Sequence, residues 1–517
     1  MLKKFNQKVT EGFLFIDQYE LVMAQLYFKM GVHEQSVQFE HFFRDYPDYG
    51  SHKAGYCINA GLEWFVDWMQ NTSITENDIE LMKQSKTSSG KQLFEDDFLN
   101  WLKKNGNFSN VNLRSIPEGR VIHPNTPITA VEGPLAVAQM LETALLNQLN
   151  YQILIATKAS RIKEIVKEQS VLEFGARRAH DRGANAGARA ALIGGADFTS
   201  NVGISYELGF SPKGTHAHSM IQLFLALGKT ELDAFEAFAD LYPDDCTLLI
   251  DTVDTLNSGL PNAVKVFKKL KQKGHEPVGI RLDSGDLAYL TMRCADYMNK
   301  EGFPDTKIVL SNELDELRIW QILSQIRKEA SAFNADPDKI INRLMFGVGT
   351  SLITSSGDSA LSGVYKIAAV RDNGEWKPTL KLSETAKKMT LPGQKQVWRI
   401  IEASGKATAD LICSKSENPE STENLLLINI GKENERREVN RNNISRLDPL
   451  LIDIFNNGKL IYDFPSINEL REFRKKDLNE LDFGVRRLVN PHIYQVSISP
   501  EIWQLKKSLL KRLNRDK

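Results

Sequence analysis

Six short apolar runs in the middle of this chain constrain its fold more than any other feature. Each run ends in polar or glycine-rich residues and is followed by a helical segment, with a spacing of roughly 30 residues. This spacing is what parallel strands joined by crossover helices require. The runs are 171–174, 197–200, 247–251, 278–283, 307–311 and 343–349. They predict an α/β barrel or an open α/β sheet, and the uninterrupted series of units favours the (β/α) barrel.

The chain of 517 residues is longer than the roughly 250–300 residues at which a single core stops growing. Residues 12–30 predict an amphipathic helix, and 36–43 predict a strand. A stretch punctuated by proline and glycine at 117–135 predicts a domain boundary, and the strand–helix periodicity weakens past 395. We therefore expect an N-terminal α+β domain, the α/β domain and a C-terminal domain, with the bounds 1–134, 135–395 and 396–517.

Composition excludes several classes of partner. The formal net charge is -1, so no global field directs the chain toward nucleic acid or acidic membranes. The four cysteines form no CxxC pair, which indicates neither a disulfide framework nor a zinc finger and favours a reducing cytoplasm. The sequence contains no run of 18 apolar residues, so it predicts no membrane-spanning helix. An anionic ligand must be held by a local cluster of residues.

Polar segments follow the predicted strands, at the end where α/β barrels build their sites. After the first run, Arg177 and Arg178 follow a glycine turn and can grip phosphate, although an ordinary surface helix start fits equally well. Further along, Thr215 lies beside two histidines, His216 and His218, at the start of a predicted helix. A histidine there can be structural, a general base or a phosphoryl acceptor. A zinc site lacks the usual partner ligands.

The segment 279–286 carries Arg281 and Asp283 at a predicted strand end, and Asp251 and Asp254 follow the preceding strand. These acids can cap helices or form a glycosidase pair, but neither interpretation uses the arginine. An arginine beside acids indicates recognition of a small carboxylate or phosphate together with a magnesium-bound polyphosphate.

The last predicted strand ends in a Gly-Val-Gly-Thr turn, with Gly347, Gly349 and Thr350 as a backbone cradle for phosphate. Together the four segments predict a site rich in anion-binding groups, with carboxylates for a metal and one histidine. That inventory indicates phosphosugar or nucleotide chemistry and does not name the base.

These segments resemble the nicotinate phosphoribosyltransferase family along almost the whole chain. The residues that carry the resemblance are 17–24, 173–178, 214–218, 256–263, 281–286, 310–316, 347–350 and the late Asn490-Pro-His-Ile-Tyr. One departure is Ile16, which stands where the family often has threonine. The resemblance implies an irregular α/β barrel with an N-terminal α+β domain and a small C-terminal appendage, assembled as a homodimer with composite sites.

The resemblance also implies roles for individual residues. Tyr19 would stack on the pyridine ring, Thr215 and Arg281 would contact nicotinate, and His218 would be the phosphorylated histidine. Thr350 and the Gly347/Gly349 loop would hold the phosphoribosyl phosphate, with Arg177 and Asp283 as further substrate-binding residues.

The implied reaction joins nicotinate to phosphoribosyl pyrophosphate in NAD salvage, with ATP and Mg²⁺ as cofactors. The pyridine nitrogen has a free lone pair, so positioning and charge stabilisation are expected to supply the catalysis. Nicotinamide and quinolinate phosphoribosyltransferases are rival activities within this chemistry. A glycosidase and a non-enzymatic nucleotide sensor are the rivals outside it.

Overall fold

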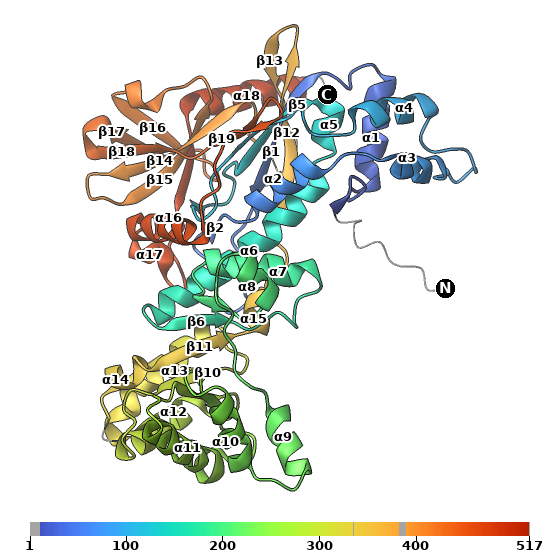
Figure 1. Cartoon of the computed structure of the whole chain (residues 1–517). Helices are drawn as coiled ribbons and strands as arrows, with labels where there is room; N and C mark the ends of the chain where they lie inside the picture. The colour runs from blue at the N-terminus through green and yellow to red at the C-terminus, as the bar shows by residue number, and fades with distance from the viewer. Residues whose placement is uncertain (1–10, 334, 382–388, 516–517) are drawn as a thin grey trace. The chain divides into compact units, whose positions relative to one another are not determined.

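The computed structural model describes residues 11–333, 335–381 and 389–515 and consists of two compact units. Unit 1 combines Met1–Leu154 with Ala360–Lys517, and unit 2 is Ile155–Ser359 (Figure 1). The long helix α6 (Glu142–Val166) runs across the chain boundary between them. The predicted division into three domains stays a prediction.

Unit 2 is built around a parallel sheet made of the six predicted runs. Its strands are β6 (Ser170–Glu173), β7 (Phe198–Thr199), β8 (Thr247–Leu249), β9 (Gly279–Leu282), β10 (Lys307–Leu310) and β11 (Leu344–Val348). They pair in the order β7-β6-β11-β10-β9-β8, and each recorded pairing is parallel. The predicted strands and their parallel pairing are confirmed. Within the described part of the chain β7 and β8 are the edges of this sheet, so barrel closure stays a prediction.

Helices follow the strands of unit 2, as crossover connections between parallel strands require. They are α7 (Arg182–Ile193), α8 (Val202–Glu207), α9 (His218–Ala226), α10 (Glu231–Leu241), η2 (Thr255–Gly259), α11 (Leu260–Gln272), α12 (Leu287–Lys300), α13 (Glu316–Glu329), η3 (Ala330–Phe333), α14 (Pro337–Ile341) and α15 (Thr350–Ile353). Strand β9 buries Ile280 and Leu282, and α11 buries Phe267 and Leu270, which explains the apolar runs in the sequence. The polar residues that follow each strand lie at the carboxyl edge of the sheet.

Unit 1 contains a seven-stranded and a six-stranded sheet, both mainly antiparallel, and a two-stranded sheet (Figure 1). The first has the order β13-β12-β1-β5-β3-β19-β20 and the second β17-β16-β21-β15-β14-β18, while β2 pairs with β4. The strands are β1 (Ser36–Phe43), β2 (Cys57–Ile58), β3 (Asn112–Ser115), β4 (Val121–Ile122), β5 (Thr129–Pro134), β12 (Gly363–Asp372), β13 (Glu375–Pro378), β14 (Lys395–Glu402), β15 (Ala407–Ser414), β16 (Asn424–Asn429), β17 (Arg436–Asn440), β18 (Ile444–Pro449), β19 (Ile452–Asn456), β20 (Lys459–Leu460) and β21 (Gln495–Ile498). The first sheet therefore joins strands from both ends of the chain.

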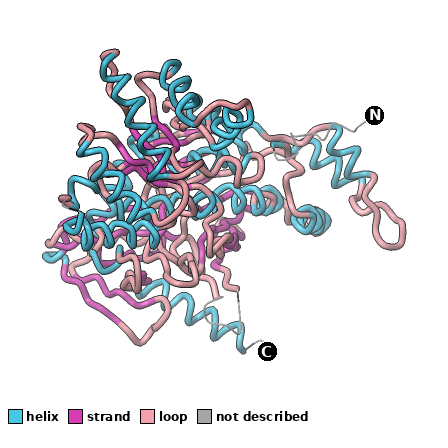
Figure 2. The backbone as a smooth tube through the Cα atoms, turned by 90° about the horizontal axis from the view of Figure 1, so that it is seen from below, coloured by secondary structure: helices cyan, strands magenta, loops and turns pink. Residues whose placement is uncertain are grey.

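Unit 1 also contains helices, the last of which leads to the C-terminus (Figure 2). They are α1 (Gln18–Lys29), α2 (Leu62–Asn71), α3 (Glu76–Lys83), α4 (Asp96–Asn105), α5 (Leu135–Gln139), α16 (Ile467–Glu480), α17 (Phe483–Arg486) and α18 (Pro500–Arg515). The predicted helix over 12–30 begins later, because Asp17 and Glu20 form a capping box at its start. Within the described residues, every helix is too short or too polar to cross a membrane.

Candidate functional site

Arg281 is the centre of a cluster of side chains at the carboxyl edge of the unit 2 sheet. Its Nε donates to the Ser311 hydroxyl at 2.9 Å, Nη1 donates to Thr215 Oγ1 at 3.2 Å, and Nη2 donates to Asp283 Oδ1 at 3.1 Å. Ser311 also donates to Asp283 at 2.5 Å, so both side chains are fixed in position. The structure thus brings the predicted residues Thr215, Arg281 and Asp283 together.

The guanidinium group of Arg281 keeps spare hydrogen-bonding capacity. Arginine has five N–H donors in a planar fork, and three of them find partners among the described residues. The side chain is 14% exposed, so the remaining two donors are only partly open to water. A site of this kind suits a small carboxylate.

Phe174 connects Arg281 with the glycine turn after β11. The Arg281 guanidinium lies 5.6 Å from the centre of the Phe174 ring, within the range of a cation–π contact. A Cβ atom on Gly347 would meet that ring at 2.5 Å, so only glycine leaves room for it. Gly347 therefore acts by making space for Phe174, and Gly349 and Thr350 are the residues that follow the strand end.

Asp251, which follows β8, holds the loop after β9. Its Oδ2 accepts from the Asp283 backbone N–H at 2.9 Å and from the Ser284 hydroxyl at 2.6 Å. Its Oδ1 is buried and has no hydrogen-bond partner among the described residues. His218 Nε2 lies 3.9 Å from that oxygen. A buried carboxylate oxygen without a donor retains the capacity to accept a hydrogen bond from a ligand or from the waters of a cation.

His218 and His216 have different surroundings although they are two residues apart. Helix α9 begins at His218, as predicted, and the His218 side chain is 39% exposed. Its Nδ1 lies 2.9 Å from the Thr252 hydroxyl, and its Nε2 lies 3.7 Å from Asp283. This histidine is accessible to a substrate and directed at the carboxylates.

His216 is buried instead, with 8% of its surface exposed. Its Nε2 accepts a hydrogen bond from the Leu249 backbone N–H at 3.0 Å, which ties the segment before α9 to strand β8. Burial lowers the pKa of His216 to about 4, so the ring is neutral at pH 7. Its geometry is that of a structural histidine.

Asp254 is separate from this cluster. Its Oδ1 accepts hydrogen bonds from the backbone N–H groups of Leu256 and Asn257, and so caps η2. These hydrogen bonds lower the pKa of Asp254, which is exposed. A glycosidase pair that includes Asp254 therefore finds no support. Within the described ranges, no three His, Cys, Asp or Glu side chains are grouped to hold a metal ion.

The loop after β6 carries Arg177, whose side chain is exposed. Buried Glu173 shapes the start of that loop by accepting hydrogen bonds from Thr199 at 2.6 Å and from the Gly175 backbone N–H. Thr350 begins α15 and is also exposed. Arg177 and Thr350 thus follow the adjacent strands β6 and β11 and are open to a ligand.

Tyr19 belongs to unit 1 rather than to the sheet that carries the other predicted site residues. It lies in α1 and is 45% exposed. Partial burial and the nearby Glu142 carboxylate raise the pKa of its phenol, which keeps the side chain uncharged. An uncharged, half-exposed aromatic ring is suited to stacking on another ring.

Three contact residues of the cluster were not predicted: Phe174, Thr252 and Ser311. Each lies at or just after the end of a strand, and that position is the signal that would have identified them. Phe174 and Ser311 lie within segments 173–178 and 310–316 that carry the resemblance, but no chemical role was assigned to them or to Thr252 from the sequence.

Comparison with known proteins covers both units. Residues 14–150, 169–400 and 394–506 match the models of the nicotinate phosphoribosyltransferase N-terminal domain, family and C-terminal domain, respectively. The chain is 36% identical over 495 residues to nicotinate phosphoribosyltransferase of Bacillus subtilis, covering 95% of this chain and 94% of the relative. The Caenorhabditis elegans enzyme of that name is 32% identical, with coverage of 95% and 92%.

Solved structures agree with these matches. Human nicotinic acid phosphoribosyltransferase superposes with a TM-score of 0.78 at 26% identity, covering 96% of this chain and 99% of that one. A nicotinate-nucleotide pyrophosphorylase from Pyrococcus furiosus shares the fold, with a TM-score of 0.64 at 21% identity and coverage of 93% and 99%. Similarity of this extent in both units, together with the strand-end cluster around Arg281, shows that the chain belongs to the nicotinate phosphoribosyltransferase family.

Proposed function

We propose that this chain is a nicotinate phosphoribosyltransferase, which forms nicotinate mononucleotide and pyrophosphate from nicotinate and phosphoribosyl pyrophosphate in NAD salvage. The observation that carries the proposal is the guanidinium of Arg281, fixed by three hydrogen bonds with two donors to spare. Family membership supports the same activity. The proposal also includes three finer points: unit 2 forms an irregular α/β barrel, the enzyme is a homodimer, and it is located in the cytoplasm.

Nicotinate would be recognised through its carboxylate. The planar fork of Arg281 matches a carboxylate with two hydrogen bonds, while the neutral amide of nicotinamide has one acceptor oxygen and an NH₂ group that repels the donors. The Thr215 hydroxyl, 3.2 Å from Nη1, is in reach of the same group. The partner subunit's Tyr19 would stack on the pyridine ring and complete a composite site.

Phosphoribosyl pyrophosphate would be held by the turns after β6 and β11. Arg177 and the Gly349–Thr350 turn supply a guanidinium, backbone N–H groups and a hydroxyl for the 5′-phosphate. Asp283 lies beside Arg281. From this position its carboxylate would face the ribose or the waters of a substrate-bound cation.

The bond that forms joins the pyridine nitrogen to the ribose C1 atom, and the bond that breaks releases pyrophosphate. The nitrogen attacks with its own lone pair, so the chain needs no general base. The residues of the cluster act by positioning the ring and by placing carboxylates near a ribose of oxocarbenium character. Mg²⁺ carried by the substrate would neutralise the departing pyrophosphate, and the buried Asp251 oxygen fits a partner for its waters.

His218 would couple ATP to this reaction. A ring nitrogen of His218 takes the γ-phosphoryl group of ATP and releases ADP, and water later cleaves the phosphorus–nitrogen bond to give phosphate. Support comes from the position of His218 at the start of α9, 39% exposed and 3.7 Å from Asp283. Unpaired backbone N–H groups at a helix start favour a bound phosphate.

One assay tests the activity directly. The purified chain is incubated with phosphoribosyl pyrophosphate, Mg²⁺ and ATP, with nicotinate or nicotinamide as the base. We expect nicotinate mononucleotide and pyrophosphate from nicotinate and little product from nicotinamide. Equal turnover of the two bases would reject the assigned role of Arg281, and no turnover of nicotinate would reject the function.

A further inference from the structure

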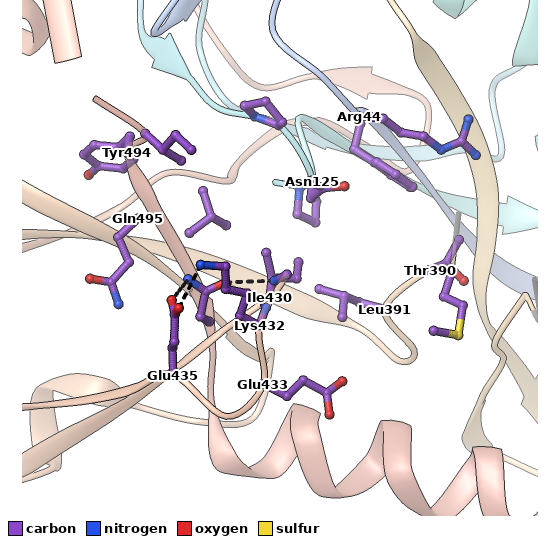
Figure 3. A pocket seen from close by; sticks show the side chains of 18 of the residues that line it. Arg44, Asn125, Thr390, Leu391, Ile430, Lys432, Glu433, Glu435, Tyr494 and Gln495 are labelled. Carbon is purple, nitrogen blue, oxygen red and sulfur yellow. Dashed lines mark hydrogen bonds and ion pairs between the residues drawn. The ribbon is translucent and has the colours of Figure 1, made fainter. Parts of the chain in front are cut away.

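A cavity of about 1040 Å³ lies within unit 1, and its lining shares no residue with the site proposed for catalysis. Arg44 and Asn125 lie on one side of it, and Lys432, Glu433 and Glu435 lie on the other (Figure 3). The start of β21 adds Ile493, Tyr494, Gln495 and Val496 to the wall. The late Asn490–Tyr494 motif, which the proposed reaction leaves unused, therefore ends at this cavity.

Most charges on the cavity wall neutralise one another. Its six cationic side chains are Arg44, Lys395, Lys432, Arg436, Arg437 and Lys506. Four of these have a carboxylate partner, in the pairs Lys395–Glu40 (3.0 Å), Lys432–Glu435 (2.9 Å), Lys506–Glu433 (2.8 Å) and Arg437–Glu402. The two cations of the wall outside these pairs are Arg44 and Arg436, and Asp45 is a further carboxylate on the wall.

Arg44 and Arg436 have no carboxylate within 4.0 Å among the residues that the structure describes. The Nε of Arg44 is shielded from solvent and has no hydrogen-bond acceptor there. Arg436 is exposed and lies over the Trp503 ring at 4.9 Å, a cation–π contact. A buried donor without an acceptor costs free energy, so an anion that accepts from it would be bound favourably.

The rest of the wall combines polar side chains, among them Asp45, Asn125 and Gln495, with a set of apolar residues. It includes Phe42, Pro124, Leu391, Ile430 and Ile493, and the Ile493 side chain is 90% exposed. The volume is at the upper end of the roughly 300–1,000 Å³ that small-molecule sites occupy. Its size fits a nucleotide better than an inorganic ion, and guanidinium groups beside apolar surface suit a phosphate attached to an apolar ring.

We propose that this cavity binds a nucleoside monophosphate, with the phosphate on Arg44 and Arg436 and the base against the apolar wall. The site is additional to the one proposed for nicotinate and phosphoribosyl pyrophosphate, and its existence does not depend on that activity. A site of this kind gives the chain a means of sensing a nucleotide outside the reaction itself.

Calorimetric titration of the full chain with AMP tests the proposal, with adenosine and inorganic phosphate as separate titrants. We expect saturable AMP binding and weaker binding of either part alone. Arg44→Gln and Arg436→Gln should each weaken AMP binding about tenfold or more, because each removes a charged hydrogen-bond donor. The matched control is Lys459→Gln, which removes an exposed cation outside the cavity and should bind AMP like the unmodified chain.

The variant Thr350→Ala distinguishes the proposed catalytic site from the cavity. It should lose nicotinate turnover and keep AMP binding. Arg44→Gln and Arg436→Gln should do the reverse, and retained turnover or an unchanged circular dichroism spectrum shows that they fold. AMP binding that is absent, unaffected by both arginine changes, or lost only in Thr350→Ala would overturn the cavity proposal. A chain without nicotinate turnover that still shows the arginine-dependent binding would reject the proposed function and leave this site supported.

Discussion

Arg281 donates a hydrogen bond from Nε to the Ser311 hydroxyl over 2.9 Å, and the same hydroxyl donates to Asp283. Arg281 lies on β9 and Ser311 directly follows β10, the strand that pairs with β9 in parallel. Ser311 therefore fixes the plane of the guanidinium without using the donors that remain for a ligand. It is a positioning residue for Arg281.

Ser311→Ala should raise the KM for nicotinate about fivefold to tenfold while kcat stays within about twofold, because one hydrogen bond to a charged group is lost. Steady-state kinetics with varied nicotinate measure both constants. Ser324→Ala is the control, since the Ser324 hydroxyl donates only to a carbonyl of its own helix. An unchanged KM in Ser311→Ala would show that the serine does not position the arginine.

Arg281→Ala should raise the KM for nicotinate by roughly tenfold to a hundredfold, the equivalent of about 1.5–3 kcal/mol for a charged hydrogen bond. Arg281→Lys should recover only part of this loss, because lysine lacks the planar fork. The same assay with nicotinamide should show a smaller effect of both changes. Full recovery by lysine would mean that charge alone, without bidentate geometry, selects the acid.

His218→Ala should abolish ATP-dependent phosphorylation of the chain and ATP hydrolysis. His216→Ala should keep both, because His216 is buried and bound to the Leu249 backbone. Labelling with γ-³²P-ATP, followed by acid treatment and peptide mapping, distinguishes the two histidines. Slow formation of product by His218→Ala is expected, since the phosphate does not bond to the ribose. Label that persists in this variant would contradict the assignment.

Tyr19 and Thr350 should complement each other across a homodimer. Tyr19→Ala and Thr350→Ala proteins are each expected to be inactive, and mixed dimers contain one site in which both residues are intact. Dissociating and reassembling the mixture should restore up to about a quarter of the activity, whereas neither variant recovers alone. A dilute sample shown to be monomeric by ultracentrifugation yet fully active would exclude composite sites.

The pH dependence of stability should report the buried state of His216. Burial lowers its pKa to about 4, below the unfolded value of about 6.5. The unfolded state therefore takes up the proton first, so this stabilisation is complete above pH 6.5 and is lost as the pH falls toward 4. At pH 5 the loss is about 2 kcal/mol.

Urea unfolding of the unmodified chain and of His216→Asn at pH 7 and pH 5 measures this effect. The difference in free energy of unfolding between the two proteins should shrink by about that amount on acidification. His180→Asn is the control, because His180 is exposed. The difference in free energy of unfolding between this variant and the unmodified chain should be the same at pH 7 and pH 5. A constant difference for His216→Asn would mean that folding does not lower the pKa of His216.

The sequence by itself determined the strands of unit 2, the start of α9 and the candidate residues Thr215, Arg281 and Asp283, which the structure brings together. Each of the six apolar runs became a parallel strand, and His218 begins its helix. These features follow from local pattern, because apolar runs must be buried and polar residues after a strand fall at the edge of the sheet. The resemblance that named the family rests on the same local segments.

Tertiary structure decided which residues meet. Asp251 and Asp254 lie three positions apart, yet one holds the turn after β9 while the other caps η2. His216 is buried against β8 and His218 is accessible, although both occur in one short segment. Ser311 reaches Arg281 because β9 and β10 are neighbours in the sheet. Strand order depends on packing between residues far apart in the chain, so no local pattern could have specified these contacts.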